Sequence, residues 1–360
     1  MWKPIKQITI KVGSNVLTRA DGTLNVTRMS HLVDQIVTLH RRGIKIVLVS
    51  SGAVAAGRSE YEMTRKMDDV SQRQLYSAIG QVKLLHRYYE LFREQGVYVG
   101  QVLTMKENFS TRRHYLNQKN CIETMLGSGV IPIVNENDTV SITELMFTDN
   151  DELSGLIASM VNSDALIILS NIDGIYNGSP SDPDTEVIRE IEPGRDLSAY
   201  IRTGKSTFGR GGMLTKTSIA TKVASEGIEV VIANGLRDNI LLSLFDEHGQ
   251  VVCTRFKPST EPVSGLKKWL AHSEGFAKGA VYVNDKAVQA LQGNRAVSLL
   301  PVGVCRVEGT FEKDDIVRIM TEREEQIGVG RISVDSEEAA LLMGEHGQKP
   351  FIHYDYMCFN

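Results

Sequence analysis

The sequence predicts an α/β protein, a three-layer αβα sandwich with a mainly parallel sheet, followed by a small, mainly β C-terminal domain. The first observation is that short runs rich in Val and Ile alternate with longer amphipathic stretches up to about Phe256, as in parallel strands joined by crossover helices. The second is the polar segment Lys257–Gly265, which contains two prolines and ends this alternation. The third is that the apolar runs beyond it are short and separated by turn residues.

Six nearly continuous apolar runs in the first region are predicted to be strands buried on both faces of the sheet. They are Ile8–Val12, Ile44–Val49, Val97–Leu103, Val130–Val134, Ala165–Leu169 and Glu229–Ala233. Between them, apolar residues at helical spacing predict helices over Met29–Val37, Gln72–Phe92 and Arg112–Leu126. We expect the first helix to begin after a cap at Thr27 and to stop at Gly43.

Five short runs beyond the polar segment are predicted to be strands of a second domain. They are Ala280–Val283, Ala296–Leu300, Gly303–Val307, Ile316–Met320 and Ile327–Ser333. A chain of 360 residues is also more easily accommodated in two cores than in one. We therefore expect a first domain over residues 1–257, a linker over residues 258–275 and a second domain over residues 276–360.

Composition and charge indicate a soluble globular protein. Hydrophobic residues make up 42% of the chain and charged residues 23%. The formal net charge of −4 gives no electrostatic reason to expect a polyanionic partner. The region from Ala277 to the C-terminus has nine Lys or Arg against thirteen Asp or Glu, so it lacks the basic footprint of a nucleic-acid-binding domain. We therefore do not expect a nucleic-acid partner.

Apolar segments and cysteines bear on the location of the protein. No stretch is long and apolar enough to cross a bilayer, and the N-terminal residues do not form a secretion signal, so neither membrane insertion nor export is expected. The cysteines lie far apart without paired spacing, which predicts neither a zinc site nor a disulfide framework. They are Cys121, Cys253, Cys305 and Cys358. A reduced, cytoplasmic setting is therefore expected.

Lys11 lies inside the first predicted strand, directly before the turn Gly13–Asn15. A buried ammonium group is costly without a partner, and an anionic ligand would supply one. Backbone N–H groups of the turn could also face a phosphate. The alternative is that Lys11 extends from the end of the strand to solvent.

The segment Ser50–Ala53 follows the second predicted strand and opens a stretch rich in Ala and Gly. Small residues let a ligand approach the backbone, and a helix N-terminus attracts a carboxylate or a phosphate. The alternative is an ordinary serine cap with tight helix packing.

The segment Gly209–Lys216 combines glycines with a lysine before a predicted helix, as a polyphosphate site requires. It lacks the Walker A spacing, and the dinucleotide pattern GxGxxG does not occur in the chain. The alternative is a flexible surface loop.

Carboxylates and carboxamides gather after the fourth predicted strand, at Asn135, Asn137 and Asp138, and again at Asn150 and Asp151. Ligands of α/β proteins sit at the carboxyl ends of parallel strands, so two such clusters at this edge predict an enzyme site. Asp138 could pair with a substrate ammonium group, and Asp151 could hold two lysines in position. Solvated turns with Asx caps are the alternative, and metal ligation is a competing role. The sequence has no HExxH motif and no His/Cys cluster, which disfavours hydrolytic zinc chemistry.

The order of these motifs along the chain resembles the amino acid kinase family. The matching segments are Lys11–Ser14, Ser51–Ala53, Gln74–Gln81, Asn135–Asp138, Asp149–Asp151, Asp173–Tyr176 and Gly211–Lys216. Within the family, the sequence is similar to the members that phosphorylate glutamate. Ser298–Val304 and Gly309–Phe311 resemble the PUA domain that many of those members carry, so the resemblance spans the chain.

The resemblance implies the amino acid kinase fold for residues 1–257 and a PUA-like domain for residues 276–360. It also implies that ATP and L-glutamate react, with Mg²⁺, to give L-glutamyl 5-phosphate, the first step of proline biosynthesis. Feedback inhibition by proline, a homo-oligomer (dimer or tetramer) and channelling of the product to glutamyl phosphate reductase are expectations of the same kind. The alternatives are an acetylglutamate or aspartate kinase of the same family and an RNA-binding PUA protein.

Residue roles are also implied by the resemblance. Lys11 and Lys216 are expected to stabilise the transition state, with Asp151 as their organiser. The expected glutamate contacts are Ser51, Gly52, Asn135, Asp138 and Asn150. The expected nucleotide contacts are Lys11, Gly13, Ser170, Asn171, Arg210, Gly211, Gly212, Met213, Leu214, Thr215 and Lys216, and no protein ligand of a metal is expected. Asn171 and Arg210 depart from the family's pattern, which often has Asp and a small hydroxyl residue at these two positions.

Overall fold

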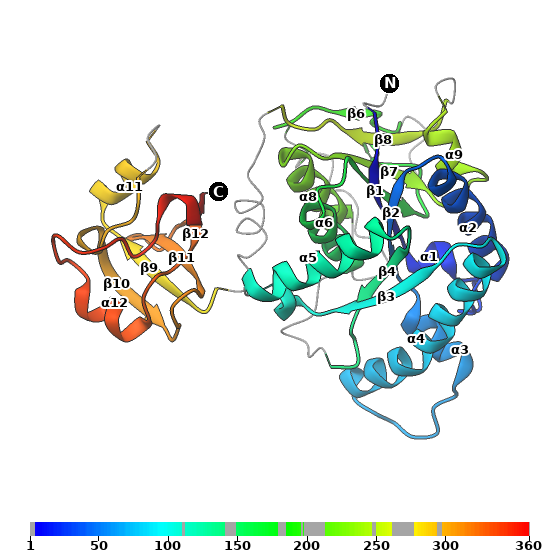
Figure 1. Ribbon diagram of the computed structural model, residues 1–360, viewed down its shortest axis with the longest axis horizontal. Helices are drawn as coiled ribbons and strands as arrows, with labels where there is room; N and C mark the ends of the chain where they lie inside the picture. The colour runs from blue at the N-terminus through cyan, green and yellow to red at the C-terminus, as the bar shows by residue number, and fades with distance from the viewer. Residues whose placement is uncertain are drawn as a thin grey trace. The chain divides into compact units, whose positions relative to one another are not determined.

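A computed structural model describes residues 4–109, 112–140, 149–178, 185–195, 197, 213–246, 250–260, 277–293 and 297–359. The chain folds into two compact units, which comprise Met1–Met105 with Lys119–Pro262 and Lys106–Gln118 with Val263–Asn360 (Figure 1). Each unit has its own sheet and its own apolar core. Within the described ranges, no helix has the length and apolar character needed to span a membrane.

The first unit is built on an eight-stranded sheet, whose described strands lie in the order β3-β4-β2-β1-β5-β7-β8-β6. These strands are β1 (Gln7–Val12), β2 (Lys45–Ser50), β3 (Val99–Thr104), β4 (Ile131–Glu136), β5 (Ala165–Ser170), β6 (Glu190–Ile191), β7 (Glu229–Asn234) and β8 (Cys253–Phe256). Neighbouring strands pair in parallel, except that β7 and β8 pair antiparallel. The six predicted strands correspond to β1, β2, β3, β4, β5 and β7, so the mainly parallel sheet is confirmed. β6 and β8 escape prediction because two and four residues are too few to show a period.

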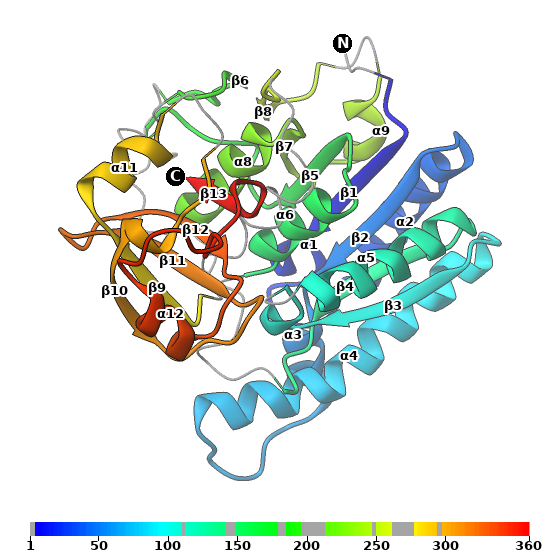
Figure 2. The same cartoon turned by 60° about the vertical axis from the view of Figure 1, so that its left-hand side comes forward.

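Helices cover both faces of this sheet, as the two views of the ribbon show (Figure 2). They include α1 (Ser14–Leu17), α2 (Val26–Arg41), α3 (Ala53–Glu60), α4 (Asp69–Glu94), α5 (Arg112–Gly127), α6 (Asn150–Met160), α8 (Met213–Ser225) and α9 (Ile240–Leu244). One apolar cluster joins α2, α3 and α4 to strand residues such as Ile167 and Leu169. Another joins α6 and α8 to Leu166 and Ile168. Because successive side chains of a strand point to opposite faces, the clusters lie on opposite sides of the sheet, which confirms the three-layer sandwich.

The first predicted helix corresponds to α2, but its expected cap is wrong. The cap is Asn25, whose side chain accepts a hydrogen bond from the N–H of Arg28, and Thr27 lies inside the helix. Asn ranks at least as high as Thr as a cap, so both choices are compatible with the local sequence. The helix ends at Arg41, and Gly43 follows with a φ of +86°, which glycine adopts without strain.

The second unit has a five-stranded sheet whose described strands lie in the order β10-β9-β11-β12-β13. Its elements are β9 (Gly279–Val283), α11 (Asp285–Leu291), β10 (Val304–Gly309), β11 (Ile316–Thr321), β12 (Gln326–Arg331), α12 (Ser336–Leu342) and β13 (Met357–Phe359). Strands pair antiparallel except β9 with β11. Four of the five predicted strands are present, so this unit is mainly β as expected. In place of the strand expected over Ala296–Leu300, Leu299 forms an isolated bridge with Ile352, and residue 296 lies outside the described residues.

Candidate active site

A cavity of about 710 Å³ lies at the carboxyl ends of the central strands of the first unit. The register of the sheet brings these ends together, because Val12 at the end of β1 pairs with Ser50 on β2 and with Leu169 on β5. Residues that follow these strands line the cavity, together with residues of α3, α4, α6 and α8. The cavity therefore occupies the sheet edge at which α/β proteins bind ligands.

Lys11, Asp151 and Lys216 meet in this cavity. Nζ of Lys11 lies 2.5 Å from Oδ1 of Asp151, and Nζ of Lys216 lies 2.9 Å from Oδ2. The three side chains come from β1, from the first turn of α6 and from the first turn of α8. Asp151 is fully buried and Lys11 is only 5% exposed. Lys11 therefore does not extend to solvent, and the partner that its burial requires is a carboxylate of the chain.

Asp151 remains ionised between the two ammonium groups. Burial raises the pKa of its carboxyl, but the charges and hydrogen bonds of Lys11 and Lys216 outweigh burial and hold the pKa below the ordinary value of 3.8. These three groups by themselves carry two positive charges and one negative charge. The cluster can therefore attract a further anion from the cavity, such as a phosphoryl group.

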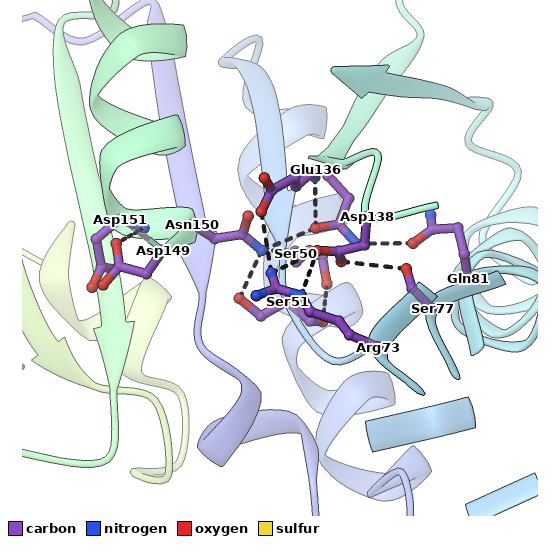
Figure 3. A network of polar contacts seen from close by, with 11 residues as sticks. Ser50, Ser51, Arg73, Ser77, Gln81, Glu136, Asp138, Asp149, Asn150 and Asp151 are labelled. Atoms are coloured by element: carbon purple, nitrogen blue, oxygen red, sulfur yellow. Dashed lines mark hydrogen bonds and ion pairs between the residues drawn. The ribbon is translucent and has the colours of Figure 1, made fainter. Parts of the chain in front are cut away.

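A network of amide side chains joins β4, α4 and α6 beside this cluster (Figure 3). Nδ2 of Asn150 donates hydrogen bonds to Oγ of Ser51 and to Oδ1 of Asn135, both at 2.9 Å. Nδ2 of Asn135 in turn donates to Oε1 of Gln81 at 2.8 Å. Asn135 and Gln81 are buried, so each amide is held in one orientation by its neighbour. The structure thus brings together three of the residues expected to contact glutamate.

Asp138, another expected glutamate contact, is bound by side chains of α4 (Figure 3). Nε and Nη2 of Arg73 donate to Oδ1 of Asp138 at 2.9 and 2.6 Å, and Oγ of Ser77 donates to Oδ2 at 3.3 Å. Nη2 of Arg73 also lies 3.4 Å from Oε2 of Glu136. Asp138 and Glu136 are 6% and 4% exposed. Arg73 therefore offsets part of the negative charge that two buried carboxylates place at this end of the cavity.

Asp149 caps α6 and lines the cavity. Its Oδ1 accepts hydrogen bonds from the N–H groups of Asp151 and Glu152 at 2.8 and 3.1 Å. Its Oδ2 is buried and has no hydrogen-bond partner among the residues that the structure describes. Burial, and then the charge of Asp151, raise the pKa of the Asp149 carboxyl to about 6. At neutral pH this carboxylate is ionised and can accept a cationic group from the cavity.

The residues expected at the nucleotide site are partly described. Those that line the cavity, besides the two lysines, are Gly13, Ser170, Asn171 and Met213, and Gly52 of the expected glutamate contacts lines it as well. A Cβ on Gly13 would lie 3.2 Å from the carbonyl oxygen of Leu169, so the turn after β1 passes close to β5. Leu214 is 65% exposed, and neither it nor Thr215 belongs to the described lining. Arg210, Gly211 and Gly212 lie outside the described residues.

Sequence reasoning misses several side chains of this site. Arg73, Ser77 and Gln81 belong to one long helix, in which a polar residue is equally consistent with a solvated face. The resemblance of Gln74–Gln81 to the family is the one signal that includes any of them. Asp149 stands beside two expected site residues, and its place in that acidic cluster is the signal that could have assigned it a role.

Each of the two units matches a known protein family. The chain matches the amino acid kinase family over residues 6–234 and the PUA domain over residues 279–352. It is 66% identical over 357 residues to the glutamate 5-kinase of Bacteroides thetaiotaomicron, which is 99% of each chain. It is 47% identical over 355 residues to the glutamate 5-kinase of Chlorobaculum tepidum, which is 98% of this chain and 97% of the relative.

Among solved structures, the carbamate kinase of Giardia lamblia bound to AMP-PNP is similar to this chain with a TM-score of 0.50. The match covers 71% of this chain and 99% of that one, at 17% identity. At this level of identity the likeness concerns the fold alone.

Proposed function

The chain belongs to the amino acid kinase family and, within it, to the glutamate 5-kinases, and on this premise we propose that it transfers the γ-phosphoryl group of ATP to the side-chain carboxylate of L-glutamate. The family assignment agrees with the resemblance of the sequence motifs. The product is L-glutamyl 5-phosphate, and the reaction is the first step of proline biosynthesis. An acetylglutamate or aspartate kinase is disfavoured, because the relatives from Bacteroides thetaiotaomicron and Chlorobaculum tepidum, each matched over nearly its whole length, are named glutamate 5-kinase.

The observation that carries the proposal is the pair of ammonium groups held on Asp151. Transfer of a phosphoryl group to a carboxylate brings two anions together, so the site needs fixed positive charge more than an acid or a base. Lys11 and Lys216 supply this charge at 2.5 and 2.9 Å from the two oxygens of Asp151. We propose that both amines contact the transferred phosphoryl group and that Asp151 keeps them in position.

The acceptor carboxylate needs no general base. A glutamate side chain has an ordinary pKa of about 4.3, so it is ionised at neutral pH. One of its oxygens attacks the γ-phosphorus of ATP while the bond from phosphorus to the β,γ-bridging oxygen breaks. The bridging oxygen keeps the electron pair, and ADP leaves.

We propose that glutamate and ATP approach the lysine pair from different parts of the cavity. The glutamate side is formed by Ser51, Gly52, Asn135, Asp138 and Asn150, of which three form one hydrogen-bonded network. The nucleotide side is formed by Gly13, Ser170, Asn171 and the segment Arg210–Lys216. What supports a common site is that the described members of both groups line the same cavity, apart from Leu214 and Thr215.

Asp149 is our candidate for the α-ammonium group of glutamate. A buried carboxylate oxygen without a hydrogen-bond partner among the described residues is costly, and a bound ammonium group would remove that cost. Asp149 directly precedes Asn150, which belongs to the proposed glutamate side.

Mg²⁺ fits this site as a companion of ATP. Across the described part of the chain, no three His, Cys, Asp or Glu side chains converge on one point that could hold a metal ion. Mg²⁺ commonly keeps several waters and binds substrate phosphates with few protein ligands. Bound to the phosphates of ATP, it would supply positive charge that offsets part of their negative charge.

Further proposals rest on the sequence or on the family. We propose domain limits at residues 1–257 and 276–360 with a linker over 258–275, a homo-oligomer, and a cytoplasmic location. We also propose proline as a feedback inhibitor and delivery of the labile acyl phosphate to glutamyl phosphate reductase.

The proposed reaction is tested by trapping its product. The protein is incubated with ATP, Mg²⁺ and hydroxylamine, which converts an acyl phosphate into a stable hydroxamate. We expect hydroxamate with L-glutamate and far less with aspartate or N-acetylglutamate. Hydroxamate with either of those two, and none with glutamate, would overturn the assignment.

A further inference from the structure

Arg73 is a cation of the cavity that the proposed phosphoryl transfer does not use. It lies in the second turn of α4 and lines the cavity. Nε and Nη2 lie 2.9 and 2.6 Å from Oδ1 of Asp138, and Nη2 lies 3.4 Å from Oε2 of Glu136. The Arg73 side chain is 24% exposed, whereas the side chains of Glu136 and Asp138 are 4% and 7% exposed. Two buried carboxylates therefore fix the guanidinium at the wall of the cavity.

Such a fixed guanidinium is suited to bind a carboxylate. The planar group of Arg matches carboxylate geometry, and a side chain that is already held in place loses little entropy when a ligand binds. The contacts to Asp138 and Glu136 involve Nε and Nη2, so Nη1 is the nitrogen that we assign to the ligand. Arg58 also lines the cavity, but its guanidinium lies over the Tyr76 ring, 5.6 Å from the centroid, and is oriented by that ring.

Arg73 belongs to the same polar network as Asn150, through Glu136 and Asn135 (Figure 3). Asn150, which directly precedes Asp151 in the sequence, donates a hydrogen bond to Asn135. The residue after Asn135 is Glu136, which contacts Arg73. Glutamate has one carboxylate at each end. If its side-chain carboxylate reaches the lysines, its α-carboxylate must lie farther along the cavity.

We propose that Arg73 binds the α-carboxylate of glutamate and so selects substrates in which this group is free. Asp138 then acts on the substrate through Arg73, as a positioning residue. The inference rests on the proposed function, because it takes the side-chain carboxylate as the phosphoryl acceptor.

The test compares L-glutamate with its α-carboxamide, which keeps the ammonium group and the side-chain carboxylate but lacks the α-charge. Both form a hydroxamate that can be followed in the trapping assay. We expect the unchanged protein to prefer glutamate by about 10- to 100-fold in kcat/KM, the scale of one hydrogen-bonded charge contact. In Arg73→Gln, KM for glutamate should rise by a similar factor with little change in kcat, and the preference should fall below about threefold.

Two further variants make the result interpretable. Arg73→Lys keeps the positive charge but lacks the planar guanidinium, so its preference for glutamate over the α-carboxamide should be intermediate. If Arg73→Gln does not fold, Arg73→Lys is the variant that tests the proposal. Arg87→Gln is the matched control, since Arg87 is on the same helix, outside the described lining, and pairs with Glu90 at 2.8 Å. This control should leave KM and the preference unchanged.

An unchanged preference in a folded Arg73 variant would overturn the inference and leave Arg73 a structural role. A lower KM for glutamate would also overturn it, since Arg73 would then compete with the substrate for Asp138. Failure of the proposed function is distinguishable from both, because the unchanged protein would then form no hydroxamate from glutamate.

Discussion

At the scale of single residues, the charge of Asp151 determines what Lys11 and Lys216 can do. Without it, two ammonium groups would face each other in a buried site, where an uncompensated charge costs several kcal/mol, on the order of 3–5 for a broken buried pair. With it, both amines are held in place by an opposite charge at the wall of the cavity. Charges that are oriented before the reaction need no reorganisation when the phosphoryl group moves.

The raised pKa of Asp149 predicts a pH dependence of glutamate use. Burial and the charge of Asp151 raise this pKa from 3.8 to about 6. Since an ammonium group binds the carboxylate and not the protonated acid, kcat/KM for glutamate should increase as the pH rises through about 6 and level off above it. Steady-state kinetics between about pH 5 and pH 8 measure this step.

The variant Asp149→Asn tests whether the pH-dependent step in kcat/KM belongs to Asp149. The amide keeps an oxygen for the cap of α6 but carries no titratable charge. We expect kcat/KM for glutamate to fall by about 10- to 100-fold above pH 6 and the step near pH 6 to disappear. A step that persists at the same pH would belong to another group.

Some residues of the site can be predicted from the sequence and others cannot. Lys11 and Asp151 stand out locally, because one is a lysine within a buried strand and the other belongs to an acidic cluster after one. Arg73 and Gln81 have no such local signal, since they are polar positions of the 26-residue helix α4. Their roles depend on side-chain contacts between α4 and the end of β4, which are tertiary contacts that periodicity does not encode.

At the scale of elements, α4 packs against α3 closely enough to exclude a methyl group. A Cβ on Gly80 would lie 1.7 Å from the carbonyl oxygen of Ala53, and a Cβ on Gly57 would lie 1.9 Å from that of Tyr76. These contacts are to backbone atoms, which cannot move aside as a flexible side chain does. The packing positions Arg73 and Gln81 of α4 near Ser51, which directly precedes the N-cap of α3.

Gly80→Ala should therefore push the two helices apart. We expect it to lower the free energy of unfolding by about 1–3 kcal/mol or more, as other insertions into packed interiors do. Chemical denaturation followed by circular dichroism measures the change. Gly127→Ala is the matched control, because nothing lies within 4 Å of a Cβ at this position in the last turn of α5, and it should be neutral or stabilising by less than about 1 kcal/mol. Equal effects of the two substitutions would contradict this account of the packing.

Gln81 connects α4 to the glutamate side of the site. Gln81→Leu would leave the buried Nδ2 of Asn135 without its acceptor, so we expect a stability loss of about 1–3 kcal/mol. We also expect KM for glutamate to rise more than kcat falls, because Asn135 orients Asn150. Gln81→Glu keeps an acceptor oxygen and should recover part of KM. A loss of stability with unchanged KM would limit Gln81 to a structural role.

The elements themselves differ in how far the sequence predicts them. Long strands rich in Val and Ile and amphipathic helices have a hydrophobic pattern that can be recognised in the sequence without knowledge of the tertiary structure. Accordingly, β1, β2, β4, β5 and β7 lie within one or two residues of their expected bounds. The two-residue β6 and three-residue β13 have no period and form because a neighbouring strand offers unpaired backbone groups. The edge strand β8 pairs antiparallel to β7, which the βα alternation gives no reason to expect.

At the scale of the whole molecule, the charge distribution separates this chain from RNA-binding proteins with a PUA domain. The chain has 40 Lys and Arg against 44 Asp and Glu, and the acidic excess extends over the region from Ala277. Phosphate contacts by Lys and Arg supply most of the affinity for nucleic acid. We therefore expect no retention of RNA on a filter at physiological salt and no effect of RNA on ATP turnover. Salt-dependent retention without kinase activity would support the RNA-binding alternative.

The measurement that tests the central claim most directly is the rate of the phosphoryl transfer step in a Lys11 variant. Labelled ATP, Mg²⁺ and glutamate are supplied at saturation, and a single turnover is followed in the unchanged protein, in Lys11→Met, and in Lys222→Met, a control on α8 outside the described lining. The account predicts that Lys11→Met folds normally and transfers the phosphoryl group about 10²–10³-fold more slowly, while the control is unaffected. Transfer at the unchanged rate in Lys11→Met would contradict it.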